Sequence, residues 1–337
     1  MKPLVSILIP AYNAGPWIAE TIRSALAQTW LHKEIIVVDD GSTDNTLAVA
    51  RSFAADGVTV VTQKNSGASA ARNRAYSLCR GDFIQWLDAD DLLAPDKISR
   101  QMELAEPGGD RRILFSSEWG WFRHRVSRAE FIATPLWADL MPKEWLRRKM
   151  AGNAHMQPAT WLVSRELTEA AGPWDERLSL DDDGEYFCRV LLASAGVRFV
   201  PGAKCFYRMS GSGSLSSVDQ SDKKLKSLWR SMQLHVGYLR SLGDDAAARD
   251  ACNVYLANWV NYFYPARPDI IAAAKELSAS LGGRLELPPV RWKYVWLEKL
   301  FGRRIASRAQ AALPNVKAAL ARSWDKAMFR LEGGAGK

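Results

Sequence analysis

Residues 83–91 read FIQWLDADD and combine an apolar run with a cluster of carboxylates. The apolar residues 83–87 predict a buried strand, and Asp88, Asp90 and Asp91 follow where that strand leaves the core. Because side chains of a strand alternate between its faces, we expect Asp88 and Asp90 to point the same way. Two carboxylates that close repel each other unless a cation separates them, and a hard divalent cation prefers oxygen ligands. A solvated turn in which Asp91 caps a following helix is the alternative, because an isolated Asp-x-Asp is common.

Strand and helix patterns alternate before this stretch. Strand-like runs occupy residues 4–9, 34–38 and 58–61, and helical patterns follow at 18–29, about 44–54 and 67–78. Asn13 and Asp44 are the expected caps of the first two helices. Such alternation predicts an α/β fold with a mainly parallel, Rossmann-like sheet that helices cover on both faces. In these sheets ligands bind beyond the carboxyl ends of the strands, so residues 10–12, 39–40 and 88–90 should share one edge.

The second half of the chain has a different pattern. It predicts strands at residues 113–116, 160–163, 197–200 and 205–208, helices at 165–170 and 181–193, and loops with short helices over 119–150. The Gly-Ser-rich residues 211–214 predict a boundary, after which helical patterns replace strands. We therefore expect an α/β domain over residues 1–217, with halves of about 1–110 and 111–217, and a helical region over 218–337.

Charge and cysteine content narrow the class of protein. The net charge is +8, and residues 288–337 alone contribute eleven basic and three acidic residues, so the basic character belongs to this tail. The four cysteines form no Cys-x-x-Cys pair, which argues against a zinc site or a disulfide scaffold. The first residues lack a signal-peptide pattern, and no stretch is apolar enough to span a bilayer. These features predict a cytoplasmic protein.

Six motifs together resemble a family 2 glycosyltransferase with the GT-A fold, which binds nucleotide sugars. The resemblance covers roughly residues 3–217, and the order and spacing of the motifs make it specific. The motifs are VSILIPAYN at 5–13, EIIVVDDGSTD at 34–44, NSGASAARN at 65–73, LDADD at 87–91, GPWDE at 172–176 and DDGEYFCR at 182–189.

This resemblance implies where a nucleotide sugar binds. Pro10, Ala11, Tyr12 and Asn13 would line the base pocket, although Tyr12 could be an ordinary loop aromatic. Either Asp39 or Asp40 would contact the nucleoside. In the family, the positions of Arg72, Asp88 and Ala89 lie near the donor sugar and its phosphates. An alternative for Arg72 is a surface salt bridge.

The resemblance also assigns the chemistry. Asp90, with Asp88, would hold Mn²⁺ or Mg²⁺, which stabilises charge on the departing nucleoside diphosphate. Asp183, paired with Asp182, takes the position of the base that deprotonates the acceptor hydroxyl, and direct displacement would invert the anomeric centre. The alternative is that these acids only cap a helix. The donor expected is a UDP-sugar, ahead of dTDP- and GDP-sugars.

The sequence departs from the family pattern in two ways. No His comes soon after Tyr207-Arg208, so the metal or phosphate contact that this His supplies elsewhere in the family is not expected here. The Gln-x-x-Arg-Trp motif and the membrane helices of processive members are also missing. We therefore expect transfer of a single sugar to a glycan or lipid-linked acceptor, such as a cell-surface polysaccharide precursor. His155 could line the acceptor side or be structural. A nucleotidyltransferase would need a basic, Gly-rich loop at residues 10–16, but this loop has one Gly and no Lys or Arg. A dinucleotide dehydrogenase would need Gly-x-Gly-x-x-Gly after the first strand, and that motif is missing. A non-catalytic protein that binds nucleotide sugars remains an alternative.

Basic and aromatic residues interleave over residues 290–297, and four more basic residues follow at 299–308. This pattern suits an anionic membrane surface, with aromatic rings at the level of the headgroups. Nothing in the chain resembles a nucleic-acid-binding module. An ordinary helical subdomain that packs its Trp residues on the rest of the protein is the equal alternative. The sequence thus predicts a cytoplasmic enzyme that could attach peripherally to the inner face of the membrane.

Overall fold

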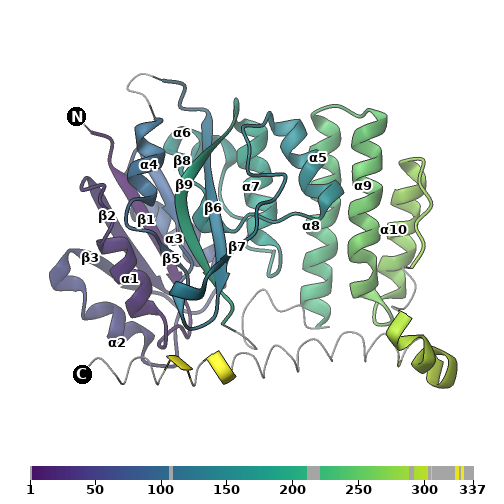
Figure 1. Ribbon diagram of the computed structural model, residues 1–337, viewed down its shortest axis with the longest axis horizontal. Coiled ribbons are helices and arrows are strands. Elements are labelled where there is room, and N and C mark those ends of the chain that lie inside the picture. The colour runs from purple at the N-terminus through teal and green to yellow at the C-terminus, as the bar shows by residue number, and fades with distance from the viewer. Residues whose placement is uncertain are drawn as a thin grey trace.

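A computed structural model describes residues 2–105, 109–210, 221–287, 292–302, 305, 323–325 and 328–329. Figure 1 shows a sheet-rich half that carries the N-terminus and a half built from long helices. The expected boundary at residues 211–214 lies outside the described residues, so the division into 1–217 and 218–337 stays a prediction.

The first sheet has the strand order β3-β2-β1-β4-β8. The first four strands are parallel, and only β8 runs antiparallel. Their continuous apolar residues leave no polar face, as expected of a sheet covered on both sides. The bounds are β1 Val5–Ala11, β2 Lys33–Asp39, β3 Val58–Thr62, β4 Phe83–Trp86 and β8 Val163–Ser164.

Helices cover both faces of this sheet. Ile7 and Ile9 share one apolar cluster with Ile18 and Ile22 of α1, whereas Leu8 shares another with α3. The alternation of β1 side chains therefore separates the two layers. The helices and 3-10 turns of this part are α1 Ile18–Leu26, α2 Thr46–Arg51, η1 Ala54–Asp56, α3 Ala68–Leu78 and α4 Lys97–Glu103.

The two predicted caps differ from the structure. Asn13 does not cap α1, because its side chain accepts hydrogen bonds from Thr43, 2.8 Å to the backbone nitrogen, and ties the first loop to the second. Asp44 accepts from the backbone of Thr46 at 2.9 Å, but α2 ends at Arg51 rather than near residue 54. Both short polar side chains join loops at the sheet edge.

A second sheet, with the order β5-β9-β6-β7, was not anticipated as a separate unit. The strands predicted at 197–200 and 205–208 form one strand, β9, which pairs with β6 in parallel across an irregularity at Ser117 and Glu118. Of the predicted strand at 160–163, Val163 begins β8 and Leu162 forms an isolated bridge with Phe115, whereas Thr160 ends a 3-10 turn. The bounds are β5 Leu92–Leu93, β6 Ile113–Phe122, β7 Glu130–Phe131, β9 Gly196–Arg208, η2 Val126–Arg128 and η3 Pro158–Thr160.

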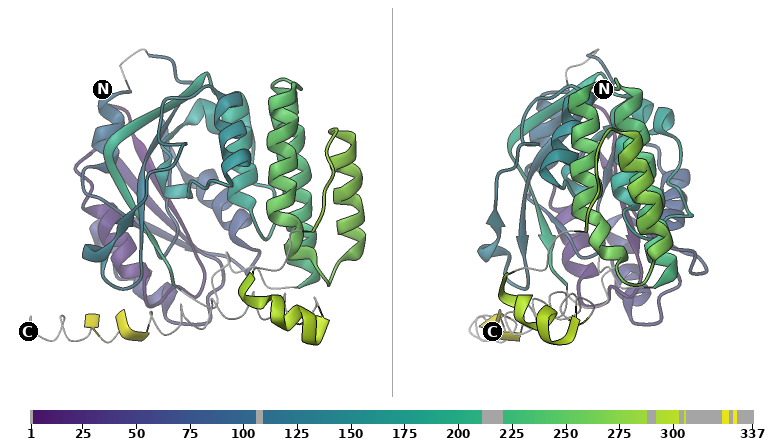
Figure 2. Two further views of the ribbon diagram at one scale, coloured as in Figure 1. Left: turned by 45° about the vertical axis from the view of Figure 1, so that its right-hand side comes forward. Right: turned by 90° about the vertical axis from the view of Figure 1, so that its right-hand side faces the viewer.

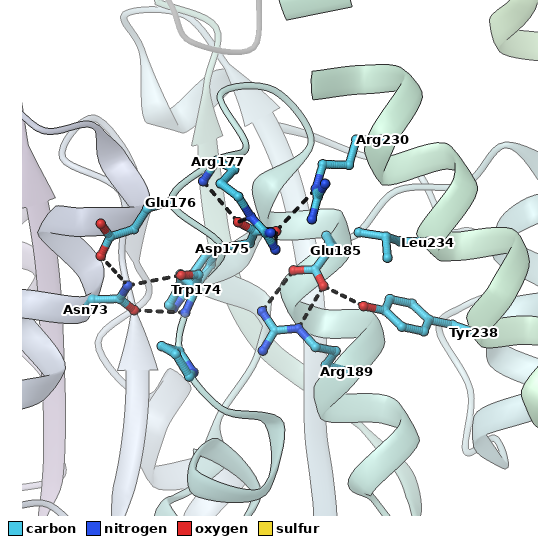
Figure 3. Close-up of a pocket in the computed structure, with 11 residues that line it drawn as sticks. Asn73, Trp174, Asp175, Glu176, Arg177, Glu185, Arg189, Arg230, Leu234 and Tyr238 are labelled. Atoms are coloured by element: carbon cyan, nitrogen blue, oxygen red, sulfur yellow. Dashed lines mark hydrogen bonds and ion pairs between the residues drawn. The ribbon is translucent and has the colours of Figure 1, made fainter. Parts of the chain in front are cut away.

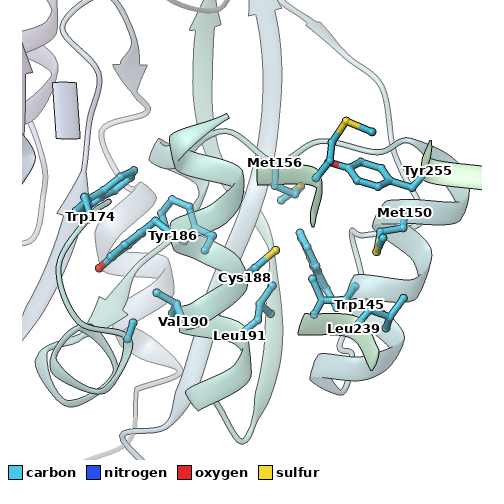
Figure 4. Packing of buried hydrophobic residues seen from close by; sticks show 14 of the residues in the cluster. Trp145, Met150, Met156, Trp174, Tyr186, Cys188, Val190, Leu191, Leu239 and Tyr255 are labelled. Atoms are coloured by element: carbon cyan, nitrogen blue, oxygen red, sulfur yellow. The ribbon is translucent and has the colours of Figure 1, made fainter. Parts of the chain in front are cut away.

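Helices α5 Pro142–Gly152, α6 Arg165–Ala171 and α7 Asp182–Ala193 connect the sheets to the helical half. The 11 residues of α5 lie where loops and short helices were expected. The apolar periodicity of this helix is weak in the sequence, although Trp145, Leu146 and Met150 are buried. Trp145 lies 5.5 Å from Trp161, and Figure 4 shows it close to Cys188 and Leu191 of α7.

The helical half consists of α8 Asp222–Ser241, α9 Ala246–Trp259, η4 Val260–Phe263 and α10 Pro268–Ser280, followed by η5 Trp292–Tyr294 and helical residues at 295–302. Leu228, Met232 and Leu256 belong to the same apolar cluster as α7 and β4, so α8 and α9 complete the core of the first half. Among the described residues, no helix is both long enough and apolar enough to cross a membrane.

Candidate active site

The acidic residues after β4 lie in a turn and not in a strand. β4 ends at Trp86, and the backbone nitrogen of Asp91 donates to the carbonyl of Asp88 at 3.1 Å. The expectation that Asp88 and Asp90 share a strand face is therefore wrong, because the turn interrupts the alternation. Asp91 does not cap a helix either, since β5 follows it.

Arg72 joins this acid turn to the start of α7. Its guanidinium donates to Asp88 at 2.8 Å and to Asp182 at 2.7 Å. The same group lies over the ring of Trp174, 4.3 Å from its centroid. Since Arg72 is only 5% exposed, the alternative of a surface salt bridge is wrong. Burial opposes the cationic form, but Asp88 and Asp182 outweigh it and raise the pKa of Arg72.

Trp174 is held in place by Asn73 from the same motif. The Asn73 side chain accepts from the backbone nitrogen of Trp174 at 2.8 Å and donates to its carbonyl at 3.0 Å. The Trp174 ring stacks on Tyr186 at 4.0 Å, and both rings contact Trp86 edge-on. These aromatic side chains pack against one another, and the Trp174 ring contacts the Arg72 guanidinium. The motif at 172–176 was visible in the sequence, but not this supporting role.

Arg208, at the end of β9, is a site residue that sequence reasoning missed. Its guanidinium donates to the carbonyl of Asp90 at 2.8 Å and to Glu20 at 2.6 Å. Its backbone nitrogen donates to Asp91 at 2.8 Å. Trp17 and Phe122 flank the guanidinium, each centroid 4.5 Å away. The Tyr207-Arg208 pair was noted in the sequence, but an arginine at a strand end gives no sign of its partners.

Burial and neighbouring carboxylates raise the pKa of Asp90 and Asp91, the two acids that Arg208 contacts. Burial and then the charge of Asp88 raise the pKa of Asp90 to about 6. Burial, Asp90 and Asp88 raise the pKa of Asp91 well above its ordinary value, and one of its oxygens has no hydrogen-bond partner. A carboxylate crowded by other carboxylates favours a nearby positive charge.

The start of α7 carries the other acids. Asp181 has φ of +59°, and its carboxylate accepts from Ser231 of α8 at 2.8 Å. Asp182 accepts from Ser69 at 3.2 Å as well as from Arg72. A Cβ atom at position 184 would lie 2.2 Å from the Asp181 carboxylate, so Gly184 is required by this close approach.

Asp183 differs from its neighbours because its carboxylate has no hydrogen-bond partner among the described residues. Burial raises the pKa of Asp183 to about 6, with further raising by Asp182 and Asp181 that the charges of His155 and Arg72 oppose. His155, which the sequence left as acceptor-side or structural, therefore lies within electrostatic reach of Asp183. An unpaired carboxylate with a raised pKa suits a general base.

The predicted nucleoside pocket lies beside β1 and β2. Pro10 and Ala11 are buried strand residues, and the Ala11 carbonyl accepts from the backbone of Asp40 at 2.8 Å. Tyr12 is 47% exposed at the edge. Ala89 is buried in the acid turn, and its carbonyl accepts from Thr21 of α1 at 2.9 Å.

Both acids after β2 are buried and hydrogen-bonded. Asp40 accepts from the Gln63 side chain at 2.8 Å and from the backbone of Ser66 and Gly67 at 2.9 and 2.8 Å. Asp39 accepts from Thr62 at 2.9 Å and more distantly from the backbone of Ser42. Asp40 thus anchors the loop before α3, and Asp39 keeps more capacity to accept another hydrogen bond.

A separate cavity of about 570 Å³ is lined mainly by residues 173–177, α7 and α8 (Figure 3). Figure 3 shows Arg177 and Arg230 directed toward Asp175, and Arg189 and Tyr238 directed toward Glu185. Neither Asp88, Asp90 nor Asp183 lines it. The cavity is lined by Asn73, Pro173, Trp174, Asp175, Glu176, Arg177, Glu185, Arg189, Arg230, Leu234 and Tyr238.

The two predicted ligands in the acid turn, Asp88 and Asp90, do not make a complete ligand set. Over the residues that the structure describes, no three His, Cys, Asp or Glu side chains are grouped to hold a metal ion. Asp88 is engaged by Arg72, whereas the pKa of Asp90 is raised by burial and by its acidic neighbour. Oxygen ligands of this kind suit Mg²⁺ or Mn²⁺, for which phosphate oxygens and water commonly complete the shell.

Comparison with known proteins gives the family. Residues 6–170 match the model of glycosyl transferase family 2. An uncharacterized glycosyltransferase of Bacillus subtilis, EpsJ, is 28% identical over 264 residues, which are 76% of this chain and 75% of that protein. One from Rickettsia typhi is 43% identical over 58% of this chain and 60% of its own. The chondroitin synthase of Escherichia coli is 47% identical over 28% of this chain, but that match spans only 14% of the synthase.

Solved structures agree on the fold. Residues 1–349 of TarS from S. aureus, crystallised with UDP-GlcNAc, superpose with a TM-score of 0.63 at 18% identity, covering 93% of this chain and 92% of that one. A mannosyltransferase of Pyrobaculum calidifontis, in complex with GDP-Man and Mn²⁺, gives 0.51 at 21% identity, covering 97% and 88%. Residues 6–170 therefore form a glycosyl transferase family 2 domain.

Proposed function

We propose that this protein is a metal-dependent, inverting glycosyltransferase that moves one sugar from a UDP-sugar to a hydroxyl acceptor. The observation that carries the proposal is the meeting of three elements through Arg72. This arginine contacts Asp88 after β4 and Asp182 at the start of α7, and Asp183 stands unpaired beside them. The acids predicted to bind the donor and the candidate base thus lie near Arg72, in a family 2 domain whose ligands are expected at the carboxyl edge of the sheet.

The donor would bind along the edge from β2 to the acid turn. Asp39 is the better candidate to accept the N–H of a uracil ring, because Asp40 already accepts three hydrogen bonds. Pro10, Ala11, Tyr12 and Asn13 border the same place. The TarS structures with UDP and UDP-GlcNAc support a UDP-sugar, and the GDP-Man complex of the archaeal enzyme is the reason to test GDP-sugars too.

Asp90 and then Asp88 would hold the divalent ion. A bound Mn²⁺ or Mg²⁺ would supply Lewis-acid stabilisation of the departing diphosphate. Arg72, which pairs with Asp88 and Asp182, would neutralise phosphate charge beside the ion. Arg208 keeps the carbonyl of Asp90 turned inward, which positions the turn.

Asp183 would act as the base. Its carboxylate accepts the proton of the acceptor hydroxyl as that oxygen attacks the anomeric carbon, and the nucleoside diphosphate leaves from the opposite side. Attack and departure on opposite sides invert the anomeric configuration. Asp182 stays bound to Arg72 and Ser69 and so fixes the first turn of α7.

Names of relatives indicate the kind of acceptor. They include a putative teichuronic acid biosynthesis glycosyltransferase of Bacillus subtilis, 41% identical over 30% of this chain, and the chondroitin synthase. These names favour a cell-surface polysaccharide or glycolipid precursor as acceptor. We expect transfer of single sugars, because the sequence lacks the Gln-x-x-Arg-Trp motif of processive members.

Thermal unfolding with UDP, GDP and dTDP, each with and without Mn²⁺, tests the donor and the metal together. UDP with Mn²⁺ should stabilise the wild type and should not stabilise Asp90→Ala. Equal stabilisation of both proteins would disprove the metal assignment. Preferential stabilisation by GDP would replace the donor and leave the metal site standing.

A further inference from the structure

The helix at residues 295–302, here called the tail helix, exposes large apolar side chains. Trp296 is 57% exposed, Leu300 70% and Phe301 56%, and Ile305 is also exposed. Trp296 and Leu300 are four residues apart and so lie on one face. The helix packs inward through η5, where Tyr294 is 7% exposed.

Lysines border this apolar face. Lys293 and Lys299 are both exposed, three residues before and three after Trp296, so they flank the face that carries Trp296 and Leu300. Lysine side chains of this kind reach headgroup phosphates while their alkyl stems cover apolar surface. The sequence of residues 288–337 carries a charge of +8 in all.

The tail lies at the end of the molecule that holds the acid turn. Figures 1 and 2 show the tail helix at the end opposite to the N-terminus, toward which β1 runs. Farther along the tail, Asp325 pairs with Arg125 at 2.7 Å, and Phe329 lies 6.2 Å from His124.

Those contacts continue inward to the site. The ring of His124 lies 5.5 Å from Trp17, which in turn flanks Arg208, the partner of the Asp90 carbonyl. Trp324, next to Asp325, is 69% exposed. Exposed aromatic side chains of the tail and the mouth of the donor site therefore lie at one end of the molecule.

We propose that the tail helix lies in the interface of an anionic bilayer and thereby turns the active site toward lipid-linked acceptors. Mixed tryptophan, leucine and lysine on one helix face favours a lipid interface over a protein partner, whose contact core would be depleted of lysine. The helix would bind in the plane of the membrane, since no described helix can span one. The choice of acceptor rests on the proposed function, whereas the binding to lipid does not.

Vesicle flotation of the full-length protein tests this inference. We expect the wild type to float with vesicles of phosphatidylcholine and 30% phosphatidylglycerol, to float poorly with phosphatidylcholine alone, and to be released by high salt. The double variant Trp296→Glu/Leu300→Glu should reduce the bound fraction at least ten-fold. Lys293→Gln and Lys299→Gln should each weaken partitioning about five-fold on anionic vesicles.

Leu31→Glu is the matched control, because Leu31 is 86% exposed but precedes β2 at the other end of the sheet. It should float like the wild type. Equal flotation of the tail variants and the control, or no flotation of the wild type, overturns the inference. The inference is also overturned if light scattering shows that the wild type is a dimer and that Trp296→Glu/Leu300→Glu is a monomer. Stabilisation by UDP and Mn²⁺, measured on the same samples, reports separately on the proposed function and should not change in any of these variants.

Discussion

At the scale of single residues, the site is defined by which carboxylates already have partners. Asp88, Asp182, Asp40 and Asp91 are each engaged by an arginine or by backbone nitrogens. Asp183 has no such partner among the described residues, and its environment raises its pKa to about 6. The structure therefore separates one carboxylate that is free to take a proton from several that maintain the shape of the site.

Asp183→Asn should lower kcat about 10²- to 10⁴-fold, the usual contribution of a general base, and leave KM for the donor nearly unchanged. The amide has the same size but cannot accept a proton. Initial rates of UDP release measure both constants. Full turnover of the variant would remove Asp183 from the mechanism.

The pH profile of the wild type gives a check on Asp183 together with Asp90, since the pKa of each is raised to about 6. A base works only when deprotonated, and its pKa is raised to about 6. We therefore expect kcat/KM to be level above about pH 7 and to fall as the pH drops through 6. A profile that stays flat down to about pH 4, the ordinary value for an aspartate, would contradict this assignment.

Arg208→Lys should keep the fold but weaken donor binding, because lysine cannot contact the Asp90 carbonyl and Glu20 at once in the same geometry. We expect at least a ten-fold rise in KM for the donor and a smaller change in kcat. Arg198→Lys, on the exposed side of the same strand, is the control and should leave KM unchanged. A fall in kcat alone would argue against a role in positioning the acid turn.

At the scale of elements, the start of α7 is where packing sets the positions of the proposed catalytic acids. Asp181 adopts a left-handed conformation and reaches Ser231 of α8, while Gly184 leaves room for its carboxylate. The next two residues are Asp182 and Asp183. Their positions therefore depend on contacts between α7 and the helical half.

Gly184→Ala should displace this turn and lower kcat about 10²-fold, the effect of a misplacement of about 1 Å. It should also destabilise the protein by about 1–3 kcal/mol through overpacking. Gly237→Ala in α8 is the control, because a Cβ there meets nothing within 4 Å. That change should stabilise the helix by up to about 1 kcal/mol. Urea unfolding and initial rates measure both variants.

At the scale of the whole molecule, the helical half completes the core of the sheet-rich half. Buried side chains of α8 and α9, including Leu228, Met232 and Leu256, share one cluster with α5, α7 and β4. One apolar cluster thus includes residues from both sides of position 217, where the division into two domains stays a prediction.

Leu256→Ala should cost about 2–5 kcal/mol in the free energy of unfolding, the usual range for a buried leucine. UDP with Mn²⁺ should then raise the melting temperature of the variant by as much as that of the wild type, because the site itself is unchanged. A single unfolding transition that moves as a whole would show that both halves unfold together. Two transitions, of which only one moves, would show that they are independent.

The sequence by itself determined the alternation of strands and helices over residues 4–91, because apolar periodicity and turn residues act locally. It also placed Asp39, Asp88 and Asp90 at strand ends, and the motifs identified the family. Only the tertiary structure decided how the acids are partnered. Arg72 reaches Asp182 across 110 residues and Arg208 reaches Asp90 across 118, and no local pattern encodes such contacts. Likewise, one strand at 196–208 and the helix at 142–152 form where packing against distant segments outweighs weak local signals.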